Sequence, residues 1–315
     1  MMYLAMAGML TAAVFQGAFS LNDDGQTVTI LENETPVFAY RYVPGKRPLY
    51  VPERYKRACY IHPLYGLDGE VMTQDFPIDH FHHRGVFWAW PDSTLGERRA
   101  DVWALDGFRE VHAAWITRET DDTHAELAVE NHWVYDDAPD VPVIKERVRM
   151  VVHPAQDNHR AIDFDLSFEN VSKEVFTLRG SGTDNKGYGG FCLRPDASRA
   201  PFTFSSAAGK SSEDVLELAS PWADVSYATQ PKGEQFSGAA IFQHPDNPGY
   251  PHPGWILRHY GFLGQSWPHS KDHALEPGAS FTLRYRLFLH RGTADEAGVA
   301  AAFLAYEKEC QPEQP

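Results

Sequence analysis

The feature that most constrains the fold is the alternation of apolar and polar residues in several segments. In AIDFDLSFEN, residues 161–170, one set of alternate positions is apolar: Ile162, Phe164, Leu166 and Phe168. Successive side chains of a β-strand point to opposite faces, so this pattern predicts a strand with one buried and one solvated face. The same alternation in residues 124–135 and 143–154 predicts two more strands of an antiparallel sheet.

Most other apolar segments are also short enough to be strands, and turn sequences rich in glycine, proline, aspartate and asparagine separate them. They are residues 26–33, 36–43, 85–90, 238–244 and 280–292. One segment, 293–309, has apolar residues at helical spacing and begins with Thr293, which can cap a helix. We therefore predict an all-β chain, a large antiparallel β-sandwich with one C-terminal α-helix; a β-barrel or jelly roll is the alternative.

The N-terminal segment indicates export. Residues 1–20, MMYLAMAGMLTAAVFQGAFS, carry no charge and are mostly apolar, and polar residues follow at once. This pattern predicts a signal peptide, although the usual basic residue near the start is missing; a membrane anchor or a buried segment is the alternative. No other segment is apolar over the roughly 20 residues that a spanning helix needs. We expect a periplasmic or secreted protein, with residues 21–315 as one β-sandwich domain and no membrane association after signal removal.

Charge and cysteine content make several partners improbable. The chain has 28 Lys and Arg against 43 Asp and Glu, a net charge of −15. An acidic chain repels phosphate backbones and anionic lipid surfaces, so nucleic acid is not an expected partner. The cysteines Cys59, Cys192 and Cys310 show no CxxC spacing, so neither a thiolate zinc site nor a disulfide scaffold is indicated.

A run of histidines is the first candidate site. In DHFHHRG, residues 79–85, His80, His82, His83 and Arg84 stand within five positions. If the run continues into the strand at 85–90, His80 and His82 share one face. We predict His80 and His82 as catalytic proton-transfer groups, and His83 and Arg84 as substrate-binding groups. A metal site, which would need a third ligand, and a structural histidine cluster are the alternatives.

A glycine-rich segment is the second candidate. In GSGTDNKGYGGFCLR, residues 180–194, five glycines flank Asp184, Asn185 and Lys186. Glycine backbone allows close approach of a ligand, so we predict Asp184 as a catalytic partner and Lys186 as a substrate-binding residue. The alternative is a hairpin with a solvated tip. The order of residues does not match a phosphate-binding loop.

A proline-rich segment, residues 242–261, is the third candidate. Tryptophan beside hydrogen-bonding side chains is what recognition of a sugar requires, because sugars have apolar faces and a rim of hydroxyls. The predicted substrate-binding residues are His244, Asn247, Trp255 and Arg258. An ordered structural loop is the alternative.

Glu146 is predicted to be catalytic for a different reason. It lies on the same strand face as Ile144, Val148 and Met150. A carboxyl group on an apolar face has a raised pKa, which suits general acid or base catalysis. The alternative is a buried glutamate paired with an arginine such as Arg84.

These segments together resemble one bacterial family, labelled methane oxygenase PmoA or PmoA-like and also filed as a domain of unknown function. The most specific stretches are HFHHRG and HPDNP, and the resemblance covers about residues 58 to 292. It implies a galactose-mutarotase-like β-sandwich, and such proteins often accompany sugar-degrading genes. We reject methane oxidation, because the membrane subunit of methane monooxygenase has several spanning helices and this chain has no such segments after its N-terminus.

The combined hypothesis is an exported carbohydrate-active enzyme. It would hydrolyse, eliminate or isomerise a small-molecule saccharide by histidine and carboxylate acid–base chemistry, with no cofactor. One alternative is a non-catalytic carbohydrate-binding protein. The other is an enzyme that uses a divalent metal held by His80, His82 and a third ligand such as His244 or Asp184.

Overall fold

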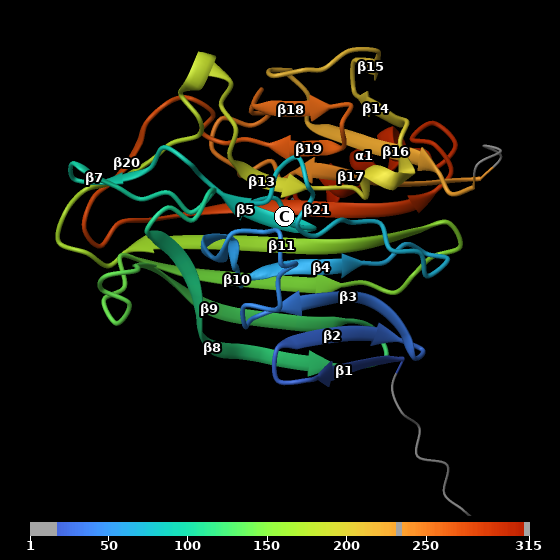
Figure 1. Ribbon diagram of the computed structural model, residues 1–315. Helices are drawn as coiled ribbons and strands as arrows, with labels where there is room; N and C mark the ends of the chain where they lie inside the picture. Colours follow the sequence, from blue (N-terminus) through green and yellow to red (C-terminus); the bar gives the residue numbers. More distant parts are fainter. Residues whose placement is uncertain (1–17, 231–234, 312–315) are drawn as a thin grey trace, which may run out of the picture.

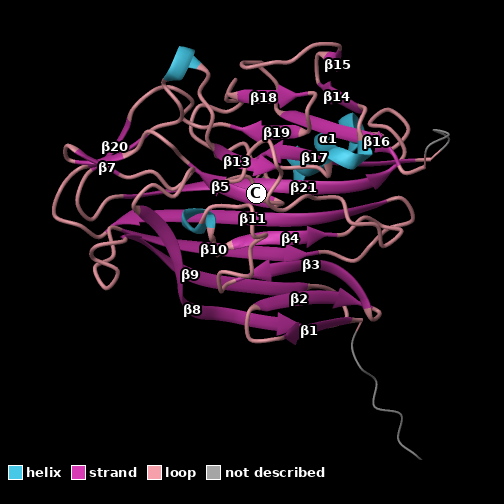
Figure 2. Ribbon diagram, viewed as in Figure 1, coloured by secondary structure: helices cyan, strands magenta, loops and turns pink. Residues whose placement is uncertain are grey.

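A computed structural model describes residues 18–230 and 235–311 of the chain (Figure 1), and strands dominate it (Figure 2). The strands in these ranges are β1 (Phe19–Asp23), β2 (Thr27–Glu32), β3 (Thr35–Arg41), β4 (Tyr60–Leu64), β5 (Val86–Ala89), β6 (Thr94–Leu95), β7 (Arg98–Arg99), β8 (Phe108–Thr120), β9 (Ala125–Tyr135), β10 (Ile144–Val152), β11 (His159–Asn170), β12 (Phe176–Leu178), β13 (Gly190–Leu193), β14 (Phe202–Ser206), β15 (Gly209–Ser211), β16 (Trp222–Ala228), β17 (Phe236–Gln243), β18 (Trp255–Arg258), β19 (Phe262–Gln265), β20 (His273–Leu275) and β21 (Ser280–Arg291). The helices are α1 (Val299–Glu309) and the short 3₁₀ turns η1 (Glu53–Tyr55), η2 (Thr183–Asn185) and η3 (Ala197–Arg199).

Three antiparallel sheets form the described part of the chain. One has eight strands in the order β1-β2-β3-β4-β5-β13-β19-β18, and one has nine in the order β15-β14-β16-β17-β21-β11-β10-β9-β8. The small sheet β20-β12-β6-β7 lies to one side of them (Figure 1). The predicted all-β fold with large antiparallel sheets is confirmed.

The two large sheets pack face to face through aromatic side chains. Phe191 of β13 lies 5.1 Å from Phe164 of β11 and 4.8 Å from Tyr285 of β21, measured between ring centroids. Trp88 of β5 packs on the same Phe164. These residues belong to one continuous buried core, and burial of such aromatic area is the main stabilising contribution to a sandwich.

The alternation in the sequence corresponds closely to observed burial. In β11, residues 159–170 alternate between partly and fully buried without interruption. Its neighbours β10 and β21 pair with it in antiparallel register, for example Met150 with Phe164 and Phe164 with Tyr285. A strand with this pattern has one register that buries its apolar face, so its local sequence is sufficient to identify it.

The C-terminal helix is shorter than the sequence predicts. α1 begins at Val299, because Gly298 has a left-handed backbone conformation with φ 66°. Thr293 does make capping-type hydrogen bonds with Glu296, but these belong to the turn before the helix. Phe303 of α1 packs on Phe242 of β17, so the helix covers part of the outer face of the nine-stranded sheet.

The start of the described chain bears on the predicted signal peptide. Residues 1–17 lie outside the described residues, whereas Phe19 and Ser20 lie in β1 and pair with β2. The signal peptide therefore stays a prediction. No helix in residues 18–230 and 235–311 has the length and apolar character of a membrane span.

Candidate functional site

A pocket of about 440 Å³ brings together residues from distant parts of the chain. Its lining comes from the histidine run, from the loops after β5 and β7, from the glycine-rich segment, and from the end of β18 and the turn that follows it. The lining residues are His80, His82, His83, Pro91, Trp103, Ser181, Lys186, Tyr188, Arg258 and Tyr260. We call this the histidine pocket.

The pocket lies against the outer face of the eight-stranded sheet. Trp88 of β5 points into the core, so its neighbour Phe87 points to the opposite face of the sheet. There the ring of His83 contacts Phe87 and Phe262 of β19, at 5.8 and 5.1 Å between centroids. Trp103 packs on Phe87 at 5.4 Å. A rigid aromatic base of this kind holds the histidines in fixed positions.

The sequence analysis considered a histidine run that continues into strand β5. In the structure the run lies outside that strand. β5 begins at Val86, and the run is folded by turns in which the His80 and His83 amides donate to the carbonyls of Pro77 and His80. His80 and His83 stack in parallel at 4.6 Å, and His82 meets both rings edge-on. The condition under which His80 and His82 would share a strand face is therefore not met, and all three rings lie together, because strand alternation does not apply in a turn.

Arg84 holds the backbone of this run and does not line the pocket. Its side chain is fully buried and donates to the carbonyls of Tyr55, Phe81 and His83. Its Nε lies 3.2 Å from Oδ1 of Asp75. These contacts suit a residue that fixes the turn, and they leave no free group for a substrate.

Asp79 and Arg194 position His80. Asp79 Oδ2 lies 3.0 Å from Nδ1 of His80, and Arg194 donates to both oxygens of Asp79 at 2.8 and 2.9 Å. Partial burial opposes ionisation, yet the hydrogen bonds from Arg194 and the close contact with His80 hold the pKa of Asp79 below its usual value. A carboxylate beside one ring nitrogen orients the imidazole, so His80 can present its other nitrogen to a ligand in the pocket.

His82 and His83 are neutral in the unliganded pocket. Burial, and then the nearby His80 and arginines, lowers the pKa of His82 to about 3. Burial also holds the pKa of His83 well below its usual value, and that side chain is only 1% exposed. Neutral imidazoles can accept or donate a hydrogen bond, which suits hydroxyl groups of a ligand.

The glycine-rich segment supplies Ser181, Lys186 and Tyr188 to the pocket, but not Asp184. Asp184 lies in η2 with its side chain 73% exposed, and it pairs with Lys186 at 3.0 Å. The loop depends on Gly187, which has φ +68° and would place a Cβ atom 2.1 Å from the ring of His269.

Gly187→Ala is expected to displace Lys186 and Tyr188 from the pocket, because both the backbone conformation and the contact with His269 exclude a methyl group. We expect ligand affinity to fall about tenfold or more, with a loss of stability on the order of 1–2 kcal/mol. Titration calorimetry and thermal denaturation check this. Gly209→Ala is the control for the backbone strain, since Gly209 has φ +106° and nothing lies within 4 Å of its Cβ position. Equal affinity in wild type and Gly187→Ala would contradict the role of the loop.

The proline-rich segment contributes only Arg258 of the residues predicted from it. Trp255 is fully buried, and its Nε1 donates to the carbonyl of Ser220, so it cannot lie over a sugar. Asn247 is buried and makes paired hydrogen bonds with the backbone of Arg284. His244 lies elsewhere, in the charged hollow described next. The three sequence segments therefore share one pocket only in part.

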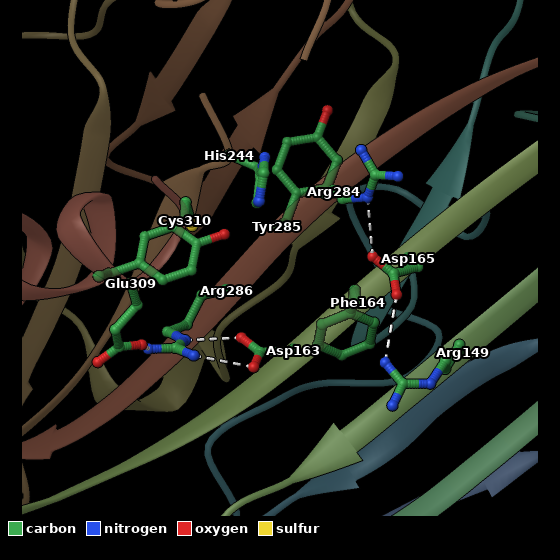
Figure 3. A pocket seen from close by; sticks show the side chains of 11 residues that line it. Arg149, Asp163, Phe164, Asp165, His244, Arg284, Tyr285, Arg286, Glu309 and Cys310 are labelled. Carbon is green, nitrogen blue, oxygen red and sulfur yellow. Dashed lines mark hydrogen bonds and ion pairs between the residues drawn. The ribbon is translucent and has the colours of Figure 1, made fainter. Parts of the chain in front are cut away.

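The charged hollow is a cavity of about 300 Å³ on the outer face of β10, β11 and β21, bordered by α1 (Figure 3). Each of its arginines is already paired. Arg286 binds both oxygens of Asp163 and also Glu309, Arg149 binds Glu126 and Asp165, and Arg284 lies 3.3 Å from Asp165. This network resembles a solvated salt-bridge surface more than a ligand site.

Glu146 lies between the large sheets and lines none of the pockets described above. It is 0% exposed and accepts hydrogen bonds from Nδ2 of Asn131 at 2.8 Å and Nε1 of Trp133 at 2.7 Å. Burial raises its pKa, as predicted, although these two hydrogen bonds oppose the shift. Its expected partner Arg84 binds Asp75 instead.

Within residues 18–230 and 235–311 there is no group of three or more His, Cys, Asp or Glu side chains placed to hold a metal ion. His244 lines the charged hollow, whereas His80 and His82 line the histidine pocket, so these three side chains do not converge.

The sequence analysis did not identify seven residues of the site: Asp79, Pro91, Trp103, Ser181, Tyr188, Arg194 and Tyr260. Asp79 had a signal, since it precedes His80 directly, but neighbours on a presumed strand point apart. Tyr188 and Tyr260 stand in segments already singled out, GSGTDNKGYGG and PGWILRHYG. Trp103 and Arg194 have no local pattern that distinguishes them from core residues.

Fold and site together define a β-sandwich protein with an imidazole-lined pocket under loops of one sheet. The sequence matches the family described as "Family of unknown function (DUF6807)" over residues 27–304. The chain therefore belongs to this family. No curated protein matches it, and nothing in the comparisons supports the methane-oxygenase label.

Several solved structures have a similar arrangement of strands at low identity. A heparan sulfate lyase mutant from Pedobacter heparinus is 8% identical, with a TM-score of 0.38, covering 92% of this chain and 38% of the lyase. A galactose 1-epimerase from Lactobacillus acidophilus NCFM is 10% identical, with a TM-score of 0.38, covering 87% and 98%. A polysaccharide lyase is 12% identical, with a TM-score of 0.33, covering 89% and 33%.

These neighbours are carbohydrate-active enzymes, and the chain spans only 38% and 33% of the length of the two lyases. At these identities and TM-scores the likeness carries no argument about activity, so any function must be argued from the pocket itself.

Proposed function

We propose that the chain is a carbohydrate-active enzyme whose active site is the histidine pocket. The observation that supports this most is the meeting of His80, backed by Asp79 and Arg194, with the aromatic side chains of Trp103, Tyr188 and Tyr260. A sugar needs aromatic surface for its C–H faces and polar groups for its hydroxyls, and the pocket offers both.

The lining favours proton transfer by imidazole and phenol groups. His80 takes a proton from the substrate, with the charge stabilised by Asp79 at 3.0 Å. Burial and the neighbouring Tyr188 raise the pKa of Tyr260, so its hydroxyl stays protonated and can donate. Elimination or isomerisation of a saccharide needs this combination of one base and one acid, whereas most glycoside hydrolases use two carboxyl groups. Export and a periplasmic or secreted location stay predictions from the sequence.

His82→Ala is expected to lower turnover about tenfold to 10²-fold, because its ring walls the pocket and fixes the positions of His80 and His83. The measurement is turnover of a panel of oligosaccharides by the full chain. His124→Ala is the matched control, since His124 is 38% exposed and pairs with Asp121 outside the pocket. Binding of a saccharide with no turnover would favour a non-catalytic binding protein. Full activity of His82→Ala would contradict this site.

A further inference from the structure

The charged side chains that line the histidine pocket are both cations. Lys186 and Arg258 reach it, whereas no aspartate or glutamate among the described residues is part of its lining. Their counter-ions lie outside: Asp184 is 3.0 Å from Lys186 and 73% exposed, and Asp214 is 3.0 Å from Arg258 and 40% exposed. Exposed ion pairs contribute little stability, so both cations can bind an anion in the pocket.

Three buried arginines add to the positive potential. Arg57, Arg84 and Arg194 have side chains at most 1% exposed. Burial is the largest cause of the lowered pKa of His82, and the charges of these three arginines lower it further. Two of them have a carboxylate near by, Asp75 and Asp79, and Arg57 lies 3.5 Å from Glu110. Burial raises the pKa of Glu110 to about 8, so its charge compensates Arg57 only in part at neutral pH.

A buried nitrogen in the lining also has no partner. His83 is 1% exposed and lines the pocket, and its Nδ1 makes no hydrogen bond to any described residue. Buried polar atoms are nearly always paired, so the ring of His83 can turn toward a sugar hydroxyl next to the anionic group without breaking a hydrogen bond at Nδ1.

We propose that the histidine pocket binds an anionic saccharide, whose carboxylate or sulfate group is held by Lys186 and Arg258; this rests on the proposed function. The guanidinium group of Arg258 offers paired donors to two oxygens, and Lys186 adds a point charge. Trp103 and the two tyrosines contact the ring of the sugar. The ligand charge offsets the surrounding arginines, which favours protonation of the histidines during the reaction.

Titration calorimetry with the full chain tests this proposal. The probes are oligosaccharides of equal length in three forms: with uronate carboxylates, with sulfate esters, and neutral, each in gluco, galacto and manno configuration. At least one anionic form is expected to bind about tenfold or more tightly than its neutral counterpart, with affinity falling as salt rises. Tight binding of the uronates alone assigns a carboxylate, and tight binding of the sulfated forms alone assigns a sulfate.

Lys186→Met and Arg258→Gln are each expected to weaken binding of the anionic form about tenfold, and to weaken binding of the neutral form by a smaller factor. Lys210→Met and Arg98→Gln are matched controls, because these residues make exposed pairs with Asp295 and Asp137 away from the pocket. The proposal is overturned if the neutral and anionic oligosaccharides bind with equal affinity and the two variants do not change the affinity for the anionic form. If neutral saccharides are then turned over in a His82-dependent way, the proposed function still holds. If no saccharide binds, both fail.

Discussion

Asp79→Asn is expected to lower kcat about 10²- to 10⁴-fold on any saccharide that the wild-type protein turns over, with KM changed less than about threefold. Asp79 lies 3.0 Å from Nδ1 of His80 and does not line the pocket, so it acts on the reaction through His80. Asparagine keeps the shape but not the charge. It can no longer stabilise the protonated ring that forms when His80 takes a proton.

The split between kcat and KM distinguishes this positioning role from a structural one. Arg194 is 1% exposed and would keep only one oxygen acceptor, so a small loss of stability, about 1–2 kcal/mol, accompanies the change. Asp137→Asn is the matched control, because Asp137 also binds an arginine through both oxygens but lies on the surface. Unchanged kcat in a folded Asp79→Asn protein would remove His80 from the base role.

The strands could be predicted because their signal is local. β9, β10 and β11 each carry an apolar face that a shift of one residue would expose, so the period alone identifies them. The residue at which α1 ends could also be predicted from the nearby sequence. The residue at which it begins could not, because the positive φ of Gly298 is visible only in the folded chain.

The histidine run shows where local reasoning ends. Its proximity to β5 suggested strand geometry, yet the turns at Pro77–His80 and His80–His83 gather all three rings on one side. The sequence pointed to the right segment, because three imidazoles beside aromatics are rare in a core. It could not predict that Asp79 and the distant Arg194 would meet there.

The proline-rich segment shows the opposite error. Trp255, Asn247 and Arg258 all looked suited to a sugar, but hydrogen bonds from Trp255 to Ser220 and from Asn247 to Arg284 turn two of them inward. Composition cannot distinguish a side chain that satisfies distant backbone from one that faces a ligand. Of these three residues, only Arg258, at the end of β18, reaches the pocket.

Glu146→Ala is expected to lower the free energy of unfolding by about 3–5 kcal/mol, the larger of the stability effects expected here. The change removes the acceptor for the indole N–H of Trp133 and the amide of Asn131, both in the core, and leaves a cavity. Urea denaturation measures it. Glu119→Ala is the control, because Glu119 is exposed on β8 of the same sheet, and it should change stability by less than about 0.5 kcal/mol.

Glu146→Gln separates the structural role from a catalytic one. Its amide oxygen can accept from Trp133 while its NH₂ group donates to Asn131, whose own amide can turn because Tyr40 lies within hydrogen-bonding distance of both its Oδ1 and its Nδ2. We therefore expect a cost of only about 1 kcal/mol near neutral pH and kcat within about threefold of wild type. A folded Glu146→Gln protein with a hundredfold lower kcat would restore Glu146 to the reaction.

The pH dependence of the same variant tests the buried charge. Burial raises the pKa of Glu146 in the folded protein above the usual 4.5. At a pH between 4.5 and the pKa of the folded state, the folded protein therefore retains a proton that the unfolded chain has released. The stability that this carboxyl group contributes is complete below pH about 4.5 and is lost as the pH rises toward the folded pKa. Glutamine has no proton to lose, so the stability of Glu146→Gln relative to wild type should rise over that window. A difference that stays constant with pH would mean that Glu146 has the same pKa folded and unfolded, which its complete burial between the two sheets argues against.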